Sequence, residues 1–185
     1  MNLKQKESVP HQTNLIREIL SWGAYIIGGF LLAWFLSSTI LVNAEVTSGS
    51  MENTIMTKDR IGGLRIAYLF NEPERLDVIV FTNPINPEDY PYVKRIIGLP
   101  GDTVTIRDNQ IYINNAEEPL EEDYLAEDMI SADGEYIVPE GHYFVMGDNR
   151  NFSKDSRVLP KTFIPREDII GKASFVWFPK PRVLK

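Results

Sequence analysis

The feature that most constrains this chain is an uncharged, largely apolar stretch from Ile19 to Ala44. As a helix it is long enough to cross the roughly 30 Å hydrocarbon core of a bilayer. Trp22 and Tyr25 lie near its start, and aromatic rings favour the headgroup region. The residues before it include three basic side chains, Lys4, Lys6 and Arg17. Because basic flanks stay in the cytoplasm, the pattern predicts a single-pass protein of the cell membrane with a cytoplasmic N-terminus.

The predicted span divides the chain into a cytoplasmic tail at residues 1–18, a transmembrane anchor at 19–44 and an extracytoplasmic domain at 45–185. A cleaved secretory signal is the alternative, because Val42 and Ala44 are small residues of the kind that precede such a cut. Removable signals have apolar regions of about 7–15 residues, so the longer stretch favours an anchor. Cleavage of the chain by itself after Ala44 is left open.

The composition excludes several kinds of chemistry. The chain has no cysteine and only two histidines, which excludes disulfides, a cysteine nucleophile and thiolate metal sites. Residues 1–44 carry a net charge of +1, so the total of −7 leaves −8 on the remainder. Such an acidic domain is poorly suited to phosphate backbones, and we therefore expect no nucleic-acid partner.

After the anchor, short runs rich in β-branched and aromatic residues alternate with turn residues, which predicts a mainly β domain. The runs are LDVIVF, YVKRIIG, TVTIRDNQIYI, EYIVPEGHYFVMG and IIGKASFVWF. In the third run, two alternating segments flank Asp108 and Asn109, which predicts a β-hairpin. The acidic segment 116–128 lacks the spacing of a calcium loop, so we expect a solvated excursion between strands and no metal site.

Few side chains could act as a catalytic base. His11 lies in the predicted tail, and His142 lies where a turn runs into a strand, so we interpret it as structural. In the strand-like run from Tyr92 to Ile97, a period of two places Lys94 on one face with Tyr92 and Ile96. Burial there would lower the pKa of Lys94 and make the amine a base near pH 7. The alternative is a surface lysine whose stem lies along apolar groups.

The segment Thr47–Met51 is rich in small residues, so the chain can turn tightly there and present Ser50 to a substrate carbonyl. Ser50 follows Ala44 by six residues, which keeps its hydroxyl within about 20 Å of the membrane end. The polar segment 147–157 follows a predicted strand. It is either a simple turn or the source of an ion pair and a hydroxyl that orient a base.

These pieces, in this order, resemble the bacterial type I signal peptidases. The resemblance covers nearly the whole chain and includes the N-terminal span. Its further motifs are Ser48–Met51 (SGSM), Asp77–Phe81 (DVIVF), Tyr92–Asp102 (YVKRIIGLPGD) and Gly147–Arg157 (GDNRNFSKDSR). The last two are long, and their joint occurrence in this order is specific. The short connections are similar to those of the compact members found in Gram-positive bacteria.

The resemblance implies a membrane-bound serine endopeptidase that removes N-terminal signal peptides from exported preproteins. It implies a Ser/Lys dyad in which Ser50 is the nucleophile and Lys94 the general base, without a cofactor or metal. The implied supporting groups are an oxyanion-hole contributor, a hydroxyl that orients the lysine, and an ion pair with a neighbouring carboxylate: Ser48, Ser153, Asp155 with Arg157, and Asp148.

The resemblance also implies shallow apolar subsites that select small residues, such as Ala, at the first and third positions before the cut. These subsites map onto five residues: Val46, Met51, Ile55, Tyr92 and Val93. The implied fold is mainly β, with coiled antiparallel sheets and one N-terminal transmembrane helix. The implied partners are the signal peptides of secretory preproteins, the lipid bilayer and the protein export channel.

The chain departs from the family pattern at Thr47 and Asn53, where proline is common, and at Asn151, where aspartate is common. None of these changes removes a catalytic group. Two other classes of protein are alternatives. A self-cleaving repressor domain also uses Ser and Lys, but it would need a DNA-binding segment where this chain has a span. A membrane-tethered, non-catalytic β module would also explain the span and the strands, but inactive relatives lack the pair that is present here as Ser50 and Lys94.

Overall fold

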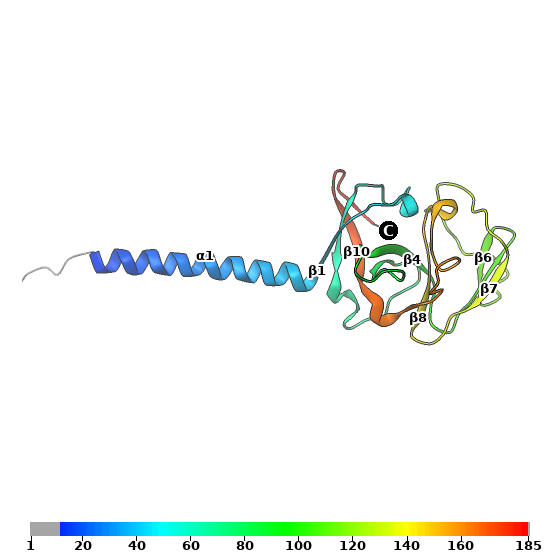
Figure 1. Ribbon diagram of the computed structural model, residues 1–185, viewed down its shortest axis with the longest axis horizontal. Helices are drawn as coiled ribbons and strands as arrows, with labels where there is room; N and C mark the ends of the chain where they lie inside the picture. Colours follow the sequence, from blue (N-terminus) through cyan, green and yellow to red (C-terminus); the bar gives the residue numbers. More distant parts are fainter. Residues whose placement is uncertain (1–11, 185) are drawn as a thin grey trace, which may run out of the picture. The chain divides into compact units, whose positions relative to one another are not determined.

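The computed structural model describes residues 12–184 (Figure 1). The chain divides into two compact units, Met1–Thr39 and Ile40–Lys185. In the first unit, helix α1 runs from Gln12 to Ile40, and Leu15–Ile40 is long and apolar enough to span a membrane. Its large apolar side chains are exposed around the whole helix, which is the surface expected of a helix that faces lipid.

The helix differs from the predicted anchor at both ends. It begins at Gln12, inside the predicted tail, and the predicted anchor residues 41–44 belong to strand β1 instead. This strand pairs with β2, where Val42 lies opposite Gly63, and the Val42 side chain is buried. Hydropathy did not locate this boundary, because an apolar helix end and a buried strand have the same composition.

The second unit is built on two antiparallel sheets, and Figure 1 shows β6 and β7 on the far side of β8 from β10. The larger sheet has the order β1-β2-β10-β3-β4-β8-β9, and β11 also pairs with β10. Its strands are β1 Leu41–Glu45, β2 Arg60–Leu64, β3 Val78–Phe81, β4 Tyr92–Gly98, β8 His142–Met146, β9 Ile164–Pro165, β10 Ile169–Phe178 and β11 Arg182–Val183. The smaller sheet has the order β6-β5-β7, with β5 Thr103–Arg107, β6 Gln110–Ile113 and β7 Gly134–Ile137.

The larger sheet is curled, which confirms the predicted mainly β fold with coiled antiparallel sheets. Irregular register interrupts the pairing of β10 with β2 and β3, and that of β4 with β8. Such bulges bend a strand and increase its twist. At Gly63 in β2, a Cβ would collide with the carbonyl O of Lys172 in β10, so the two strands approach this closely only because Gly63 lacks a side chain.

The predicted hairpin is confirmed by β5 and β6, where Arg107 pairs with Gln110. The two turn residues, Asp108 and Asn109, have φ values of 52° and 62°, as a two-residue hairpin turn of this type requires. The remaining short elements are four 3-10 turns: η1 Gly49–Met51, η2 Arg65–Tyr68, η3 Arg150–Phe152 and η4 Arg166–Asp168.

Three groups of buried apolar side chains hold the sheets together. One joins β1, β2, β3 and β10 to the segment after η1, a second packs against β3, β4 and β8, and a third joins β4 and β8 to the smaller sheet. Strand β4 contributes to the second and third groups through Ile96 and Ile97. The alternate side chains of β4 are therefore held at fixed depths, and this fixes the position of Lys94.

Candidate active site

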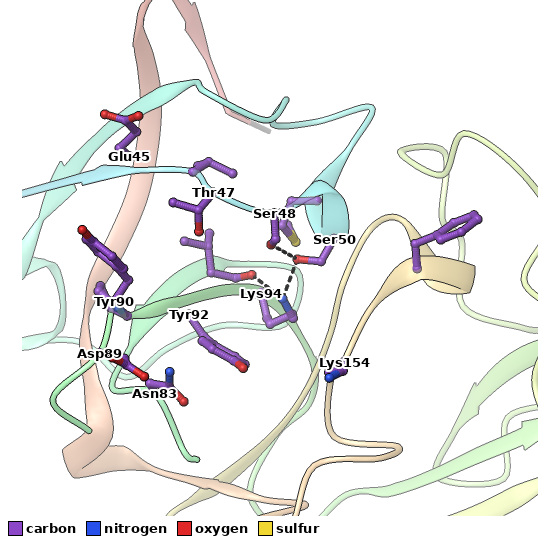
Figure 2. A pocket seen from close by; sticks show the side chains of 15 residues that line it. Glu45, Thr47, Ser48, Ser50, Asn83, Asp89, Tyr90, Tyr92, Lys94 and Lys154 are labelled. Atoms are coloured by element: carbon purple, nitrogen blue, oxygen red, sulfur yellow. Dashed lines mark hydrogen bonds between the residues drawn. The ribbon is translucent and has the colours of Figure 1, made fainter. Parts of the chain in front are cut away.

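Ser50 in η1 and Lys94 in β4 meet at one pocket, where Figure 2 shows their side chains converging. Lys94 Nζ lies 2.6 Å from Ser50 Oγ, within hydrogen-bond distance. The amine also donates to the carbonyl O of Val93 at 3.0 Å. Both residues are buried, with 6% of Ser50 and 4% of Lys94 exposed. The alternative of a surface lysine is therefore wrong.

Burial also changes the pKa of the Lys94 amine. It lowers the pKa of Lys94 from 10.5 to about 8, while the negative charges of Asp155 and Asp148 oppose that shift. No carboxylate within residues 12–184 forms an ion pair with Lys94, so desolvation of the ammonium is the largest effect. With a pKa of about 8, roughly a tenth of the amine is neutral at pH 7 and about half at pH 8. This arrangement can remove a proton from the Ser50 hydroxyl.

Ser48 lies on the same side of the pocket as the dyad. Its Oγ is 3.3 Å from Ser50 Oγ, so two hydroxyl groups lie side by side in the pocket. Ser48 has extended backbone angles and precedes η1, so the chain turns directly after it, and Ser50 lines the pocket. The structure therefore brings together the predicted Ser48, Ser50 and Lys94.

The start of the segment 147–157 packs against η1, the turn that holds Ser50. The Asn149 N–H donates to the carbonyl O of Ser50, and Asn149 Nδ2 donates to that of Gly49, both at 3.1 Å. A Cβ at position 147 would collide with the Ser50 carbonyl O, so only glycine permits this approach. Sequence reasoning did not single out Asn149, although it lies inside the GDNR motif.

The predicted pair of Asp155 and Arg157 is present. Arg157 donates through Nε to Asp155 Oδ1 at 2.8 Å and through Nη2 to Oδ2 at 2.9 Å. Asp155 is fully buried, and its Oδ2 also accepts the Gly147 N–H at 3.1 Å. The same carboxylate therefore holds both ends of the loop that packs on Ser50.

Asp148, predicted as a carboxylate beside this pair, forms an ion pair of its own with Arg95. It accepts two hydrogen bonds from the Arg95 guanidinium, at 2.9 Å from Nε and 2.7 Å from Nη2, and both side chains are almost completely buried. Thr54 Oγ1, three residues after the end of η1, also donates to this carboxylate. Arg95 was not singled out from the sequence. Its position next to Lys94 on a strand was the available signal, because neighbouring residues point to opposite faces.

Ser153 is half-buried, and its Oγ, which is shielded from solvent, has no hydrogen-bond partner among the residues that the structure describes. The hydrogen bonds of the Lys94 amine go to Ser50 and Val93 instead. Ser153 Oγ lies close to the position that a Cβ of Gly147 would occupy, in the same loop that contacts Ser50. The predicted orienting role of Ser153 thus stays a prediction.

The acidic segment 116–128 is not solvated throughout, which corrects the expectation at Glu122 and Tyr124. Glu122 forms an ion pair with Arg150, and the Tyr124 hydroxyl donates to Glu122 at 2.6 Å. The Tyr124 ring lies 4.0 Å from the Arg95 guanidinium, and its carbonyl O accepts a bond from Asn53 Nδ2 at 2.7 Å. Burial and the Glu122 charge raise the pKa of Tyr124. Within residues 12–184 no cluster of acidic or histidine side chains could hold a metal ion.

The pocket around the dyad has a volume of about 610 Å³. Four of the predicted subsite residues line it, namely Val46, Met51, Tyr92 and Val93. Ile55 does not line the pocket, because it is completely buried in the core group that joins β1, β2, β3 and β10. The lining residues that sequence reasoning missed are Glu45, Thr47, Asn83, Asp89, Tyr90, Pro91, Phe152 and Lys154.

His142 takes no part in this site. It begins β8, its Nδ1 lies 2.9 Å from the carbonyl O of Glu140, and it does not line the pocket. The only titratable side chain within hydrogen-bond distance of Ser50 Oγ, among the described residues, is Lys94.

Comparisons with known proteins place the chain in a family. The family model described as signal peptidase, peptidase S26, matches residues 19–178. A probable signal peptidase I-2 from a Synechocystis species is 35% identical over 97% of this chain and 80% of its own length. Signal peptidase I S from Bacillus subtilis is 36% identical over 88% of this chain and 91% of its own length. A crystal structure of a signal peptidase I from Enterococcus faecalis V583 is 38% identical, covers 55% of this chain and 97% of its own, and has a TM-score of 0.48.

Proposed function

The chain belongs to the signal peptidase family, peptidase S26, as a serine endopeptidase that acts on the signal peptides of preproteins, and we propose that Ser50 and Lys94 are its catalytic dyad. The observation that carries this proposal is the buried contact of 2.6 Å between Lys94 Nζ and Ser50 Oγ. Within residues 12–184, no other base lies within hydrogen-bond distance of this hydroxyl. A neutral lysine is the base that such a site can offer.

In the proposed first step, neutral Lys94 accepts the Ser50 hydroxyl proton while Oγ attacks the scissile carbonyl carbon. The tetrahedral intermediate then collapses, and the ammonium of Lys94 gives its proton to the leaving amine of the mature protein. The signal peptide remains as an ester on Ser50. Lys94 next removes a proton from water, whose oxygen attacks this ester, and the proton returns to Ser50 Oγ as the acid leaves.

The negative charge that develops on the carbonyl oxygen needs donors. We assign this role to the backbone N–H of Ser50 and the hydroxyl of Ser48, whose Oγ lies 3.3 Å from the nucleophile. Loss of one such donor typically raises the barrier by about 2.7–4 kcal/mol. Asp155 with Arg157 and Asp148 with Arg95 would hold the surrounding loop and strand in place, and Ser153 would orient the amine of Lys94.

The pocket walls support a preference for small residues before the cut. The segment from Glu45 to Ser48 lines one wall and the segment from Tyr90 to Lys94 the other, with Val46, Tyr92 and Val93 among them. An extended peptide between them could form main-chain hydrogen bonds, and the shallow pockets would select its side chains. We expect small residues such as Ala at the first and third positions before the cut.

The apolar helix fits a membrane-anchored protein. We propose that α1 is a single-pass anchor with its N-terminus in the cytoplasm and the β unit outside. The basic residues Lys4 and Lys6, which support this orientation, lie outside the described residues. The lipid bilayer would then be a partner, and the protein export channel would deliver the substrate. Ser50, eleven residues after Thr39, would act close to the membrane surface.

The test compares Ser50→Ala and Lys94→Ala in the full chain, assayed separately on a secretory precursor in detergent. We expect each to lower kcat/KM by about three to six orders of magnitude. Lys180→Ala, at an exposed lysine outside the pocket, is the control that should keep the parent rate. The kcat/KM of the parent should rise with pH up to about 8, because burial sets the pKa of Lys94 there. Normal processing by Lys94→Ala would refute the dyad.

A further inference from the structure

The two ends of the active-site pocket carry opposite charges. Glu45 and Asp89 line one end, and Lys154 lines the other, where Phe152 also contributes to the wall. In Figure 2, Glu45, Asp89 and Tyr90 lie on one side of the dyad and Lys154 on the other. A peptide that passes through the pocket therefore meets two different electrostatic environments, one before Ser50 and one after it.

The chain order shows which end holds which part of the substrate. The pocket-lining segments Glu45–Ser48 and Tyr90–Lys94 both run toward the dyad, so their first residues lie farthest from Ser50. The proposed subsites for residues before the cut, Val46, Tyr92 and Val93, belong to these segments. The residues that follow the cut must then lie on the opposite side of Ser50.

Phe152 and Lys154 belong to a third segment, which reaches the dyad from that opposite side. The Asn149 N–H of this segment donates to the carbonyl O of Ser50 at 3.1 Å, which fixes the loop directly beside the nucleophile. The buried Asp155, bonded to the Gly147 N–H at 3.1 Å, closes the loop just after Lys154. Lys154 is thus attached to a rigid base while its own side chain extends from the surface.

Lys154 is available to a ligand. It is exposed, and no carboxylate within residues 12–184 pairs with it. Phe152, two residues earlier, is 76% exposed and also lines the pocket, so this segment supplies an aromatic ring and an ammonium group to the pocket. A flexible, uncompensated ammonium at the edge of a pocket favours an acidic side chain and disfavours a basic one.

We propose that Lys154, with Phe152, forms the subsite for the first two residues of the mature protein and favours an acidic residue there. This inference rests on the proposed function, because it uses the cut at Ser50 to divide the substrate. An exposed charge pair contributes up to about 1 kcal/mol, so the preference corresponds to about a fivefold ratio in kcat/KM. Because the pair is solvent-exposed, the ratio should fall toward one at 1 M salt.

The test uses the full chain in a neutral detergent and two sets of precursor peptides with Ala at the first and third positions before the cut. The sets differ only in carrying Glu or Lys at the first or at the second position after it. The measured quantity is the ratio of kcat/KM for Glu over Lys at each position. We expect a ratio of about five for the parent, about one for Lys154→Gln and an inverted ratio for Lys154→Glu.

Lys180→Glu is the matched control, because it makes the same charge change at an exposed lysine that does not line the pocket. It should keep the parent ratio. If the parent cleaves the peptides but Lys154→Glu leaves the ratio unchanged, the subsite is wrong and the dyad stands. If Lys154→Glu instead only weakens binding to vesicles with anionic headgroups, Lys154 faces lipid and the inference is also overturned. If the parent cleaves none of the peptides, the proposed function itself fails.

Discussion

The two faces of strand β4 bury two neighbouring cations in opposite ways. Arg95 meets the Asp148 carboxylate through two hydrogen bonds, at 2.9 and 2.7 Å. Lys94 forms no ion pair within the described chain, and burial lowers its pKa to about 8. A buried cation with a matched anion keeps its charge and holds structure together, whereas one without it can lose its proton. One strand thus supplies a structural cation and the proposed base.

The largest expected change in stability comes from breaking the ion pair between Arg95 and Asp148. Arg95→Met should lower the free energy of unfolding by about 3–5 kcal/mol, because it leaves the Asp148 carboxylate buried without a countercharge. The measurement is urea-induced unfolding of the full chain in a mild detergent. Arg75→Met is the matched control, since the Arg75 pair with Asp102 is partly exposed, and it should cost about 1 kcal/mol. Equal losses in the two variants would show that the burial of Asp148 is unimportant.

Replacing Lys94, which has no ion pair within the described chain, should change the free energy of unfolding in the opposite direction. Burial lowers the pKa of Lys94 from 10.5 to about 8, so the unfolded chain binds this proton more tightly than the folded chain. The free-energy cost of burying the charged ammonium therefore destabilises the folded state fully below pH 8, and this cost disappears as the pH rises toward 10.5. Lys94→Met should raise the free energy of unfolding at pH 7, on the order of 3 kcal/mol, while abolishing activity.

The same unfolding measurement, repeated from pH 7 to 10.5, checks this prediction. The difference between Lys94→Met and the parent should shrink with rising pH. Lys172→Met is the control of opposite sign, because Lys172 Nζ lies 2.5 Å from a carboxylate O of Asp77 and its loss should destabilise the chain. A stabilisation by Lys94→Met that does not change with pH would mean that the volume of the side chain, and not its charge, is responsible.

The smallest expected effect concerns Tyr124, whose ring lies 4.0 Å from the Arg95 guanidinium. Tyr124→Leu removes this contact and the hydroxyl bond to Glu122, and it should cost about 1 kcal/mol of stability. It should also lower kcat a few-fold, because Arg95 is adjacent to Lys94. The measurements are urea-induced unfolding and precursor cleavage.

Tyr112 offers a matched control. Its ring lies 4.4 Å from the Arg107 guanidinium, and its hydroxyl donates to the side chain two residues earlier, as that of Tyr124 does. Tyr112→Leu should lose a similar stability without a change in kcat, because Tyr112 lies in the smaller sheet. Equal kcat values for the two variants would show that the Tyr124 contact does not support the base.

Part of this site could be predicted because it depends on local periodicity. The alternation along β4 placed Lys94 on one face with Tyr92, and the Lys94 amine lies 5.4 Å from the Tyr92 ring. The same alternation required Arg95 to point the other way. Its partner Asp148, 53 residues later, could not be inferred, because pairing over that distance depends on how β4 and β8 align.

Other errors share one physical cause. Ile55 was assigned to a substrate pocket and lies in the core, and residues 41–44 were assigned to the anchor and form a strand. Glu122 was expected in solvent and binds Arg150. In each case the polarity of the side chain is compatible with both the predicted and the observed environment. Hydrophobicity and charge state what a residue tolerates, and only its neighbours in space decide where it lies.

The apolar helix, the β-rich unit, the hairpin at Asp108 and the family are all determined by the sequence itself, because they follow from local composition, period and motif order. The tertiary structure alone decided that Lys94 reaches Ser50 and lacks a carboxylate partner within the described chain, while Arg95 has one. These outcomes depend on burial and on contacts between distant segments. A pKa responds to exactly those surroundings, so the chemistry of the site emerges only when the chain is folded.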